Sequence, residues 1–393
     1  MADKNEGFIL TIDAGGSAIK YAIMDGIGEI VVGPLSIPTP QHIEGAGEAK
    51  TEALYQEYCG KLVGLYKGFT NAEGGGTLQG IAISHPGVIK SNKLASAGML
   101  KYAVGKDLAA DLSAACGGVP VTILNDAKCA AESELARGEL QVLQEKQPGT
   151  NTKGNGACFV FGSAVGCGVI IDGKVLGGSS GEVSFGLDPN GQYFGLSGSA
   201  TVFFDRVALA LNYPVDETGK PTNVNGKEIF EKYINNKKDY PHKVEVEELF
   251  SSYTKGIASM IYTLNCCTPM TAIAFGGAIS NQPVFIERVN QEIKKYYNES
   301  SLVQIMQTPL EAPVVVACRD HNNANLYGAA INFHRQLRAE RLADALRDVM
   351  VGWPQSKELG NGVTRSKHRN MPAITAKRIT NEGNAALTGP TRK

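Results

Sequence analysis

A short stretch near the N-terminus decides how the fold is read. Residues 8–29 read FILTIDAGGSAIKYAIMDGIGE, in which two apolar runs are separated by a Gly/Ser turn and followed by an Asp-Gly pair. Runs of this length, rich in Ile and other apolar residues, are typical of strands, and two adjacent glycines allow the chain to turn sharply. The stretch therefore predicts a β-hairpin at the start of the chain.

The same design occurs a second time, well separated from the first. Residues 157–175 read ACFVFGSAVGCGVIIDGKV, again two apolar runs around a Gly/Ser turn and then Asp-Gly. A repeated unit of this kind predicts two similar lobes that face each other. Polar, Gly-rich residues 144–156 are the best candidate for the crossing between them. We therefore expect an N-terminal α/β lobe over residues 1–150 and a C-terminal α/β lobe over residues 151–350.

The rest of the chain predicts alternating helices and strands around a Gly-rich loop at 71–79. Apolar residues at helical spacing occur over residues 48–67, 199–211, 227–234, 245–265, 283–297 and 323–346, and apolar runs typical of strands occur over 80–89, 271–275 and 313–318. The pattern fails from Val351, where eight Lys or Arg face two Glu without apolar periodicity. A disordered basic tail over residues 351–393 is therefore expected.

Composition excludes several classes of protein. The 393 residues are 43% hydrophobic and 20% charged, with a formal net charge of −1, so neither a nucleic-acid nor a membrane partner is expected. The eight cysteines are scattered without Cys-x-x-Cys spacing, which favours buried reduced thiols in a cytosolic protein. No signal-peptide pattern and no apolar run long enough to span a bilayer occur, so we expect a cytoplasmic protein.

Asn125-Asp126 is the most informative pair in the chain. It closes an apolar run at 121–124 and opens a helical pattern from Ala127 to Leu135. One reading is a helix cap, because short polar side chains bind the first N–H groups of a helix. In the other, Asp126 points into a ligand site at the carboxyl end of a strand, where it takes a proton from a substrate hydroxyl. The pair alone leaves both readings open.

The two Gly/Ser turns are candidate phosphate sites. In the first, Asp13 precedes Gly15, Gly16 and Ser17, whose backbone N–H groups and hydroxyl suit a phosphate. Lys20 adds a positive charge or faces solvent. In the second turn, Gly162 and Ser163 would bind the other side of the same phosphates. Each turn alone is equally well an ordinary hairpin, but two turns in matching places make that reading less attractive. A Walker P-loop is excluded because no Gly-Lys-Ser/Thr follows.

Two further candidates lie in the second lobe. Gly276 and Gly277 follow a predicted strand and precede a helix, where a flat base or ribose can lie against bare backbone; the alternative is a simple loop. Glu182 follows a Gly/Ser loop and can accept hydrogen bonds from sugar hydroxyls; the alternative is a solvated surface residue.

Together these motifs resemble the ROK family (repressor, open reading frame, kinase) of sugar kinases, within the actin-like ATPase superfamily. The first turn is similar to the family's Asp-x-Gly-Gly-Thr loop, and residues 162–168 are similar to its second phosphate loop. Residues 125–127 are similar to its Asn-Asp-Ala-Asn motif, and Gly181-Glu182 is similar to its sugar-binding Gly-Glu. Residues 274–280 and 325–330 also look like family segments, so the resemblance covers residues 8 to 335. It implies a two-lobed α/β fold of the actin-like ATPase (ribonuclease H-like) type with a central cleft.

The resemblance also implies a role for each candidate residue. Asp126 would be the general base for phosphoryl transfer to a sugar hydroxyl. Asn125 and Glu182 would hold the sugar, with Gly98 in the loop 96–100 that helps to decide specificity. The nucleotide would be ATP with Mg²⁺, and the protein would be a homodimer. The residues implied to bind this cofactor are Asp13, Gly15, Gly16, Ser17, Lys20, Gly162, Ser163, Gly276 and Gly277.

The chain departs from the family pattern at three points. Phe185 stands where many members have a His, and no Cys cluster follows, so zinc is not expected and the sequence looks more like the zinc-free branch that contains β-glucoside kinases. Lys128 stands where the family usually has Asn; it could lower the pKa of Asp126, contact phosphate or lie on the outer face of the helix. Ala164 replaces a Gly of the second loop. Both changes leave substrate and catalytic rate open.

The sequence therefore favours an ATP-dependent sugar kinase acting on a hydroxyl, at C6, of a hexose or β-glucoside. A ROK regulator would need a DNA-binding segment before Phe8, where only seven residues stand. A non-catalytic sugar binder is suggested by Lys128 and Ala164, although Asp126 is retained. A chaperone or filament protein of the actin-like class would not explain Asn125 and Glu182 together.

Overall fold

The computed structural model describes residues 7–71, 76–90, 93–177, 183–188, 190–236, 238, 240–299, 311–320 and 323–351. Three predictions fall partly or wholly outside these residues: the sugar-binding role of Glu182, part of the Gly-rich loop at 71–79, and the tail after Val351. Residues 1–340 form one compact unit and residues 341–393 a second.

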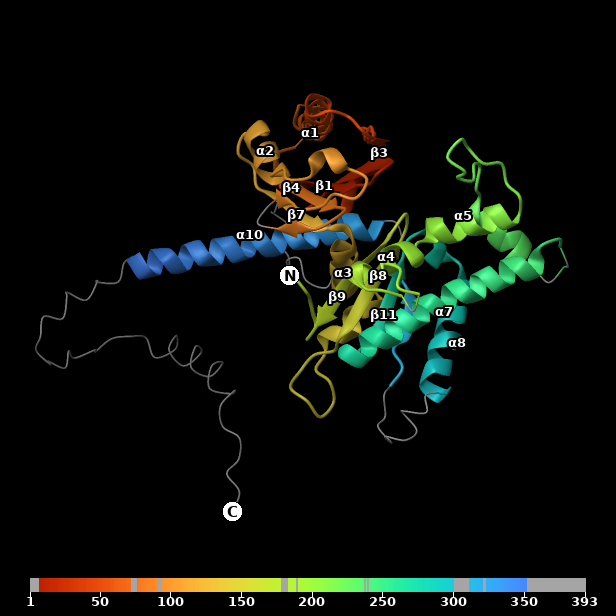
Figure 1. Ribbon diagram of the computed structural model, residues 1–393. Coiled ribbons are helices and arrows are strands. Elements are labelled where there is room, and N and C mark those ends of the chain that lie inside the picture. The colour runs from red at the N-terminus through yellow and green to blue at the C-terminus, as the bar shows by residue number, and fades with distance from the viewer. Residues whose placement is uncertain are drawn as a thin grey trace, which may run out of the picture. The chain divides into compact units, whose positions relative to one another are not determined.

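The first sheet contains the first predicted hairpin (Figure 1). Its strands are β1 (Phe8–Ala14), β2 (Ala18–Met24), β3 (Ile30–Pro38), β4 (Leu78–His85) and β7 (Val121–Asn125), in the order β3-β2-β1-β4-β7. β1 and β2 are antiparallel, as are β2 and β3, whereas β4 and β7 run parallel to β1. The turns after β1, β4 and β7 share an edge because the carboxyl ends of parallel strands lie together.

The second sheet repeats this topology. Its strands are β8 (Gly156–Phe161), β9 (Val165–Ile171), β10 (Lys174–Val175), β11 (Ala272–Gly276) and β12 (Val314–Ala317), in the order β10-β9-β8-β11-β12. β8, β9 and β10 are antiparallel neighbours, and β11 and β12 run parallel to β8. The repeated hairpin read from the sequence is confirmed, and the two-lobed actin-like ATPase fold with it.

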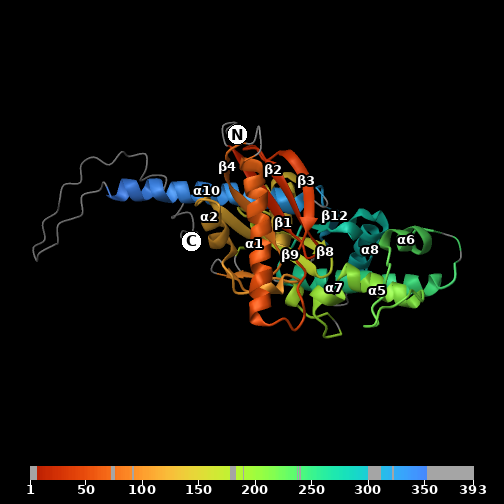
Figure 2. The same cartoon turned by 90° about the horizontal axis from the view of Figure 1, so that it is seen from above.

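Helices cover both faces of the first sheet (Figure 2). α1 (Glu48–Thr70) and α2 (Leu108–Ala115) cover one face, where Tyr58 and Leu112 join a core with Leu10 and Ile83. The first part of α10 (Ala324–Val351) covers the other face, and its Phe333 packs with Ile9, Ala22 and Ala82.

The second sheet is covered in the same way. One face packs against α5 (Ala200–Ala210), α7 (Lys243–Cys267) and α8 (Pro283–Glu299) in an aromatic core that includes Phe161, Phe203, Tyr253 and Phe285. The other face packs against α3 (Asp126–Arg137) through Ala130 and Ala131.

The two lobes thus exchange a helix. α3 follows the last strand of the first sheet but packs on the second, and α10 follows the last strand of the second sheet but packs on the first. The two helices meet at Gly328, where a Cβ atom would overlap the carbonyl oxygen of Cys129. Glycine is needed at 328 because backbone approaches backbone there.

Shorter elements complete the described chain. They are β5 (Ile89–Lys90), β6 (Lys93–Leu94), η1 (Lys101–Ala103), η2 (Glu139–Gln144), η3 (Val183–Phe185), α4 (Phe194–Ser197), α6 (Gly226–Ile229), the π-helical η4 (Phe230–Ile234) and η5 (Ala278–Asn281). The strand predicted over 80–89 instead spans Leu78–His85, because Pro86 has no N–H to continue the ladder. β3 and α2 were not predicted. The lobe boundary at residue 150, between η2 and β8, stays a proposal.

Candidate active site

The first Gly/Ser turn is a tight bend held from a neighbouring segment. Gly15 N donates to Ala18 O at 3.0 Å, and a Cβ atom at Gly15 would lie only 2.7 Å from that oxygen. Thr39 Oγ1 donates to Gly15 O at 2.7 Å and Gln41 Nε2 to Gly16 O at 3.1 Å. The residues after β3 therefore fix the carbonyl groups of the turn.

Asp13 stands at the start of this turn among three polar partners. Ser84 Oγ and Asn325 Nδ2 each donate to its Oδ1 at 3.0 Å. Lys20 is its register partner across β1 and β2; it is partly buried, and its charge acts on the Asp13 carboxyl. Burial raises the pKa of the Asp13 carboxyl, whereas Asn325, the charge of Lys20 and Ser84 lower it.

Asn125 caps α3, and its side-chain amide also contacts Asp126. Asn125 Oδ1 accepts Lys128 N at 3.2 Å, which is the helix cap. Its Nδ2 donates to Asp126 Oδ1 and to Gly87 O, both at 2.9 Å. Ala127 N donates to the same Asp126 Oδ1 at 2.8 Å. The cap reading is confirmed for Asn125, and the carboxylate of Asp126 is held in one orientation.

The start of α3 lies directly against the second lobe. A Cβ atom at Gly166 of β9 would lie 2.7 Å from Ala127 Cβ and 3.7 Å from Asp126 Oδ1, and one at Gly168 would lie 2.7 Å from Ala127 O. These two glycines of the second loop motif therefore let α3 approach the sheet. Lys128 is only 1% exposed, so its placement on the outer helix face is wrong.

The second turn is held by the start of α5. Ser199 Oγ donates to Gly162 O and to Ser163 O, both at 3.0 Å, and Thr201 N donates to Gly162 O at 3.2 Å. Gly277 lies beside it, because a Cβ atom there would overlap the carbonyl oxygen of Phe161, and its φ of +88° also favours glycine. The second turn and the proposed adenosine turn are therefore neighbours.

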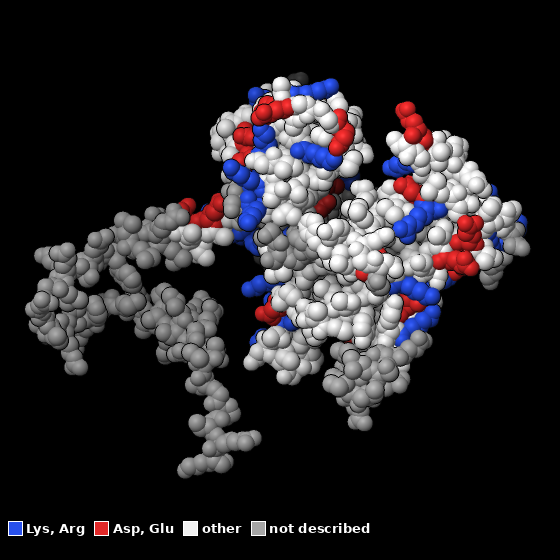
Figure 3. Space-filling view, viewed as in Figure 1, with Lys and Arg blue, Asp and Glu red and all other residues white. Residues whose placement is uncertain are grey.

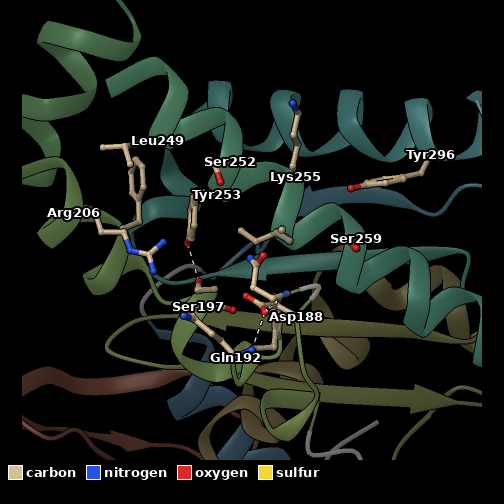
Figure 4. Close-up of a pocket in the computed structure, with 16 residues that line it drawn as sticks. Asp188, Gln192, Ser197, Arg206, Leu249, Ser252, Tyr253, Lys255, Ser259 and Tyr296 are labelled. Atoms are coloured by element: carbon tan, nitrogen blue, oxygen red, sulfur yellow. Dashed lines mark hydrogen bonds between the residues drawn. The ribbon is translucent and has the colours of Figure 1, made fainter. Parts of the chain in front are cut away.

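A pocket of about 310 Å³ lies behind the second turn, between residues 188–198 and α7 (Figure 4). Tyr253 projects from α7 and its hydroxyl donates to Gly198 O at 2.9 Å. Asp188 Oδ1 accepts the N–H of Gln192 and closes the loop on the opposite side. Among the residues that the structure describes, none of the predicted site residues lines this pocket. Its walls include Ser197 and Gly198, directly before Ser199.

The loop at 96–100 lies between the other parts of the site. A Cβ atom at Gly87 would overlap Ser96 O, and one at Gly98, whose φ is +54°, would touch Pro86. A Cβ atom at Gly16 would lie 2.9 Å from Met99 Cβ. The predicted sugar loop is therefore linked to Asn125 through Gly87 and to the first turn through Met99.

His85 ends β4 opposite Asn125 but is a poor candidate for proton transfer. It is fully buried, and burial lowers its pKa to about 4. Its Nδ1 lies 2.8 Å from Pro86 O, which can only accept, so this nitrogen carries the proton. His85 therefore holds the turn that follows it.

The structure brings Asp13, Lys20 and Ser84 together. Asn125 and Asp126 lie beside β9. Gly162 and Ser163 lie beside Gly277. Sequence reasoning missed the supporting residues Thr39, Gln41, Ser199, Thr201 and Asn325. Ser199 had a local signal, since a Ser directly before an apolar helical pattern predicts a cap. Thr39, Gln41 and Thr201 act over long sequence separations and had none, whereas Asn325 begins the family-like segment 325–330 but had no predicted role.

Within the described ranges, no group of His, Cys, Asp and Glu residues is arranged to hold a metal ion. No helix in the same part of the chain is long and apolar enough to cross a membrane.

Comparisons with known proteins agree with this architecture. The sequence model of the ROK family matches residues 9–336. The β-glucoside kinase of Listeria monocytogenes is 24% identical over 332 residues, which cover 83% of this chain and 97% of that protein.

Two solved structures share the fold over most of their length. A ROK family protein from Streptococcus pneumoniae in complex with sucrose is 25% identical, with a TM-score of 0.58 over 84% of this chain and 99% of that one. A ROK family glucokinase from Streptomyces griseus in complex with glucose and AMPPNP is 19% identical, with a TM-score of 0.56 over 82% of this chain and 98% of that one.

Proposed function

This chain belongs to the ROK family, and from that premise we propose that it is an ATP-dependent kinase that phosphorylates the C6 hydroxyl of a hexose or β-glucoside. The observation that carries the proposal is Asp126. Its carboxylate is fixed by Asn125 Nδ2 and Ala127 N at the carboxyl end of β7, beside Gly166 of the other lobe. A sugar kinase needs a fixed carboxylate at such a place between its lobes.

In this proposal the sugar hydroxyl gives its proton to Asp126 as its oxygen attacks the γ-phosphorus. The new O–P bond forms while the bond between the γ-phosphorus and the β–γ bridging oxygen breaks, and ADP leaves with that oxygen. A positioned general base contributes roughly 10²–10⁴-fold. Asn125 and Glu182 would orient the sugar, and the loop that contains Gly98 would close over it.

The two turns would hold the nucleotide between them. Residues of the first turn, Gly15, Gly16 and Ser17, and of the second, Gly162 and Ser163, would bind the phosphates. Gly276 and Gly277 would lie against adenosine. Asp13 fits a Mg²⁺ ion, because it is a carboxylate beside the turn and Mg²⁺ is usually bound by one or two carboxylates plus substrate phosphates. The ion would neutralise charge that develops during transfer.

The hairpin beyond Glu182 supports a glycoside as acceptor. Phe185, at the position where many relatives have a His, is 60% exposed. Leu187 and Tyr193 pair across the same hairpin and are also exposed. Figure 3 shows few charged side chains over α4. An uncharged aromatic surface suits the apolar face of an aglycone better than the free anomeric hydroxyl of a hexose.

The test is ADP release by the full-length protein with MgATP and a panel of acceptors: glucose, fructose, mannose, N-acetylhexosamines, cellobiose and gentiobiose. We expect a β-glucoside to stimulate ADP release most and the product to carry phosphate at C6. Stimulation only by a free hexose would instead identify a glucokinase or fructokinase. Sugar binding without ADP release would identify a non-catalytic sugar sensor, and no response at all would reject the sugar-kinase proposal.

Phe185→His tests the acceptor class separately. The substitution restores the residue that many relatives carry, so the ratio of kcat/KM for glucose to that for cellobiose should rise roughly tenfold, the size expected for one changed pocket contact. Val244→His is the control, since it places the same side chain at an exposed apolar position on α7, outside this hairpin. An unchanged ratio in Phe185→His would contradict the glycoside assignment.

We also propose that the protein is a homodimer and acts in the cytoplasm, where ATP is available. Light scattering coupled to gel filtration gives the mass of the particle. A mass of one chain, 41.7 kDa, across a range of concentrations would reject the dimer.

A further inference from the structure

Asn325 reaches the first Gly/Ser turn from the far end of the chain. It lies in the first turn of α10, which follows the last strand of the second sheet. Its Nδ2 donates to Asp13 Oδ1 at 3.0 Å, although the two residues are 312 positions apart. The hydrogen bond ties the start of α10 to the carboxylate that precedes the turn.

Four other groups face the same carboxylate. Ser84 Oγ, on β4, donates to Oδ1 at 3.0 Å, and Lys20, on β2, lies opposite Asp13 and supplies a positive charge. The charge of Asp13 also acts on Tyr58 of α1 and Cys129 of α3, but burial raises the pKa of both well above their ordinary values, so both stay neutral. Lys20 is thus the charged neighbour, and Asn325 and Ser84 are the neutral donors.

Asn325 has the largest effect of the groups that favour the ionised form of Asp13. Burial raises the pKa of Asp13, and the hydrogen bond from Asn325 lowers it more than the charge of Lys20 or the hydrogen bond from Ser84. A donor fixed on one carboxylate oxygen also fixes the rotation of the group, and therefore the direction of the other oxygen.

We propose that Asn325 is a positioning residue that holds the Asp13 carboxylate in the orientation in which it binds Mg·ATP. It acts through Asp13 and does not touch the nucleotide. Gly328, where α10 crosses α3, lies within one helical turn of Asn325. The same hydrogen bond therefore connects the nucleotide turn to the helix crossing between the lobes. The inference rests on the proposed function, because it takes Mg·ATP as the ligand of this turn.

The experiment measures MgATP binding to the full-length protein by calorimetry, without sugar. Asn325→Ala should weaken binding roughly tenfold, the effect of one hydrogen bond to a charged group.

Three further variants make the result specific. Asn325→Asp keeps the shape but places a second carboxylate against Asp13, so it should bind MgATP more weakly than Asn325→Ala does. Asn332→Ala is the matched control: it is a buried Asn on the same helix whose Oδ1 accepts from Arg335 and Gln336, and its binding should be unchanged. In Asp13→Asn, adding Asn325→Ala should cause no further loss, because Asn325 acts through Asp13.

Wild-type affinity in both folded Asn325 variants would overturn the inference, as would an equal loss in Asn332→Ala. The readout needs no sugar. If the wild type binds MgATP but phosphorylates no acceptor, the proposed function fails while the role of Asn325 is still decided. If the wild type binds no MgATP, both fail.

Discussion

The two Gly/Ser turns occupy equivalent places in sheets of the same topology, yet they carry different chemistry. The first turn follows Asp13, and Lys20 lies on the neighbouring strand of the same sheet. The last strand of this sheet ends at Asn125, directly before Asp126. The second turn, at Gly162 and Ser163, has no charged residue and is held by hydroxyl and backbone groups of α5. The repeat thus fixes the architecture in both lobes but concentrates the ionisable groups in one. We therefore expect damage to the first lobe to affect the chemical step and damage to the second to affect nucleotide affinity.

Asp126→Asn should cause the largest effect and is the most direct way to break this comparison. It keeps the shape of the side chain but removes the general base, so kcat should fall roughly 10²–10⁴-fold while the KM for ATP changes little. The measurement is steady-state kinetics of sugar-dependent ADP release. Asp25→Asn is the matched control, because Asp25 also accepts backbone N–H groups in a turn of the first lobe but lies away from the site. A rise in KM alone would show that Asp126 binds substrate and is not the base.

Gly328→Ala tests the helix exchange that joins the two lobes. The added Cβ atom meets the backbone carbonyl of Cys129, which cannot move without shifting α3, so the free energy of unfolding should fall by about 1–3 kcal/mol. Denaturant unfolding gives the value. Gly256→Ala on α7 is the matched control, because nothing lies within 4 Å of its added atom, and it should stabilise slightly by about 0.5–1 kcal/mol. Equal effects of the two substitutions would show that the helix crossing is not tightly packed.

Ser199→Ala should have the smallest effect and sharpens the comparison between the turns. The variant loses the hydrogen bonds to Gly162 O and Ser163 O and the cap of α5. A loss of about 1 kcal/mol would raise the KM for ATP roughly fivefold with little change in kcat. Ser113→Ala, on α2, is the serine control away from the second turn and should leave both constants unchanged. A fall in kcat without a rise in KM would contradict a purely nucleotide-binding role for the second turn.

Much of the site could be predicted because its parts are local. Each of the two hairpins is marked in the sequence by a Gly/Ser turn between two apolar runs. Asn125-Asp126 likewise marks a strand-to-helix junction between residues that are neighbours in the chain. The boundaries were less secure: β4 ends at His85, before the residues predicted to continue it, and β3 and α2 were missed. β3 is largely exposed, so it lacks the alternation of buried and exposed residues that identifies a strand.

The sequence by itself determined the family, the duplicated hairpin and the candidate residues of the two turns, because each depends on residues that are neighbours in the chain. The tertiary structure alone decided that Lys128 is buried, that Gly166 and Gly168 make room for α3, and that Asn325 and Ser199 hold the turns. These facts depend on which helix packs on which sheet. The lobes exchange helices, so the decisive neighbours are far apart in the sequence, where no local pattern indicates their contact.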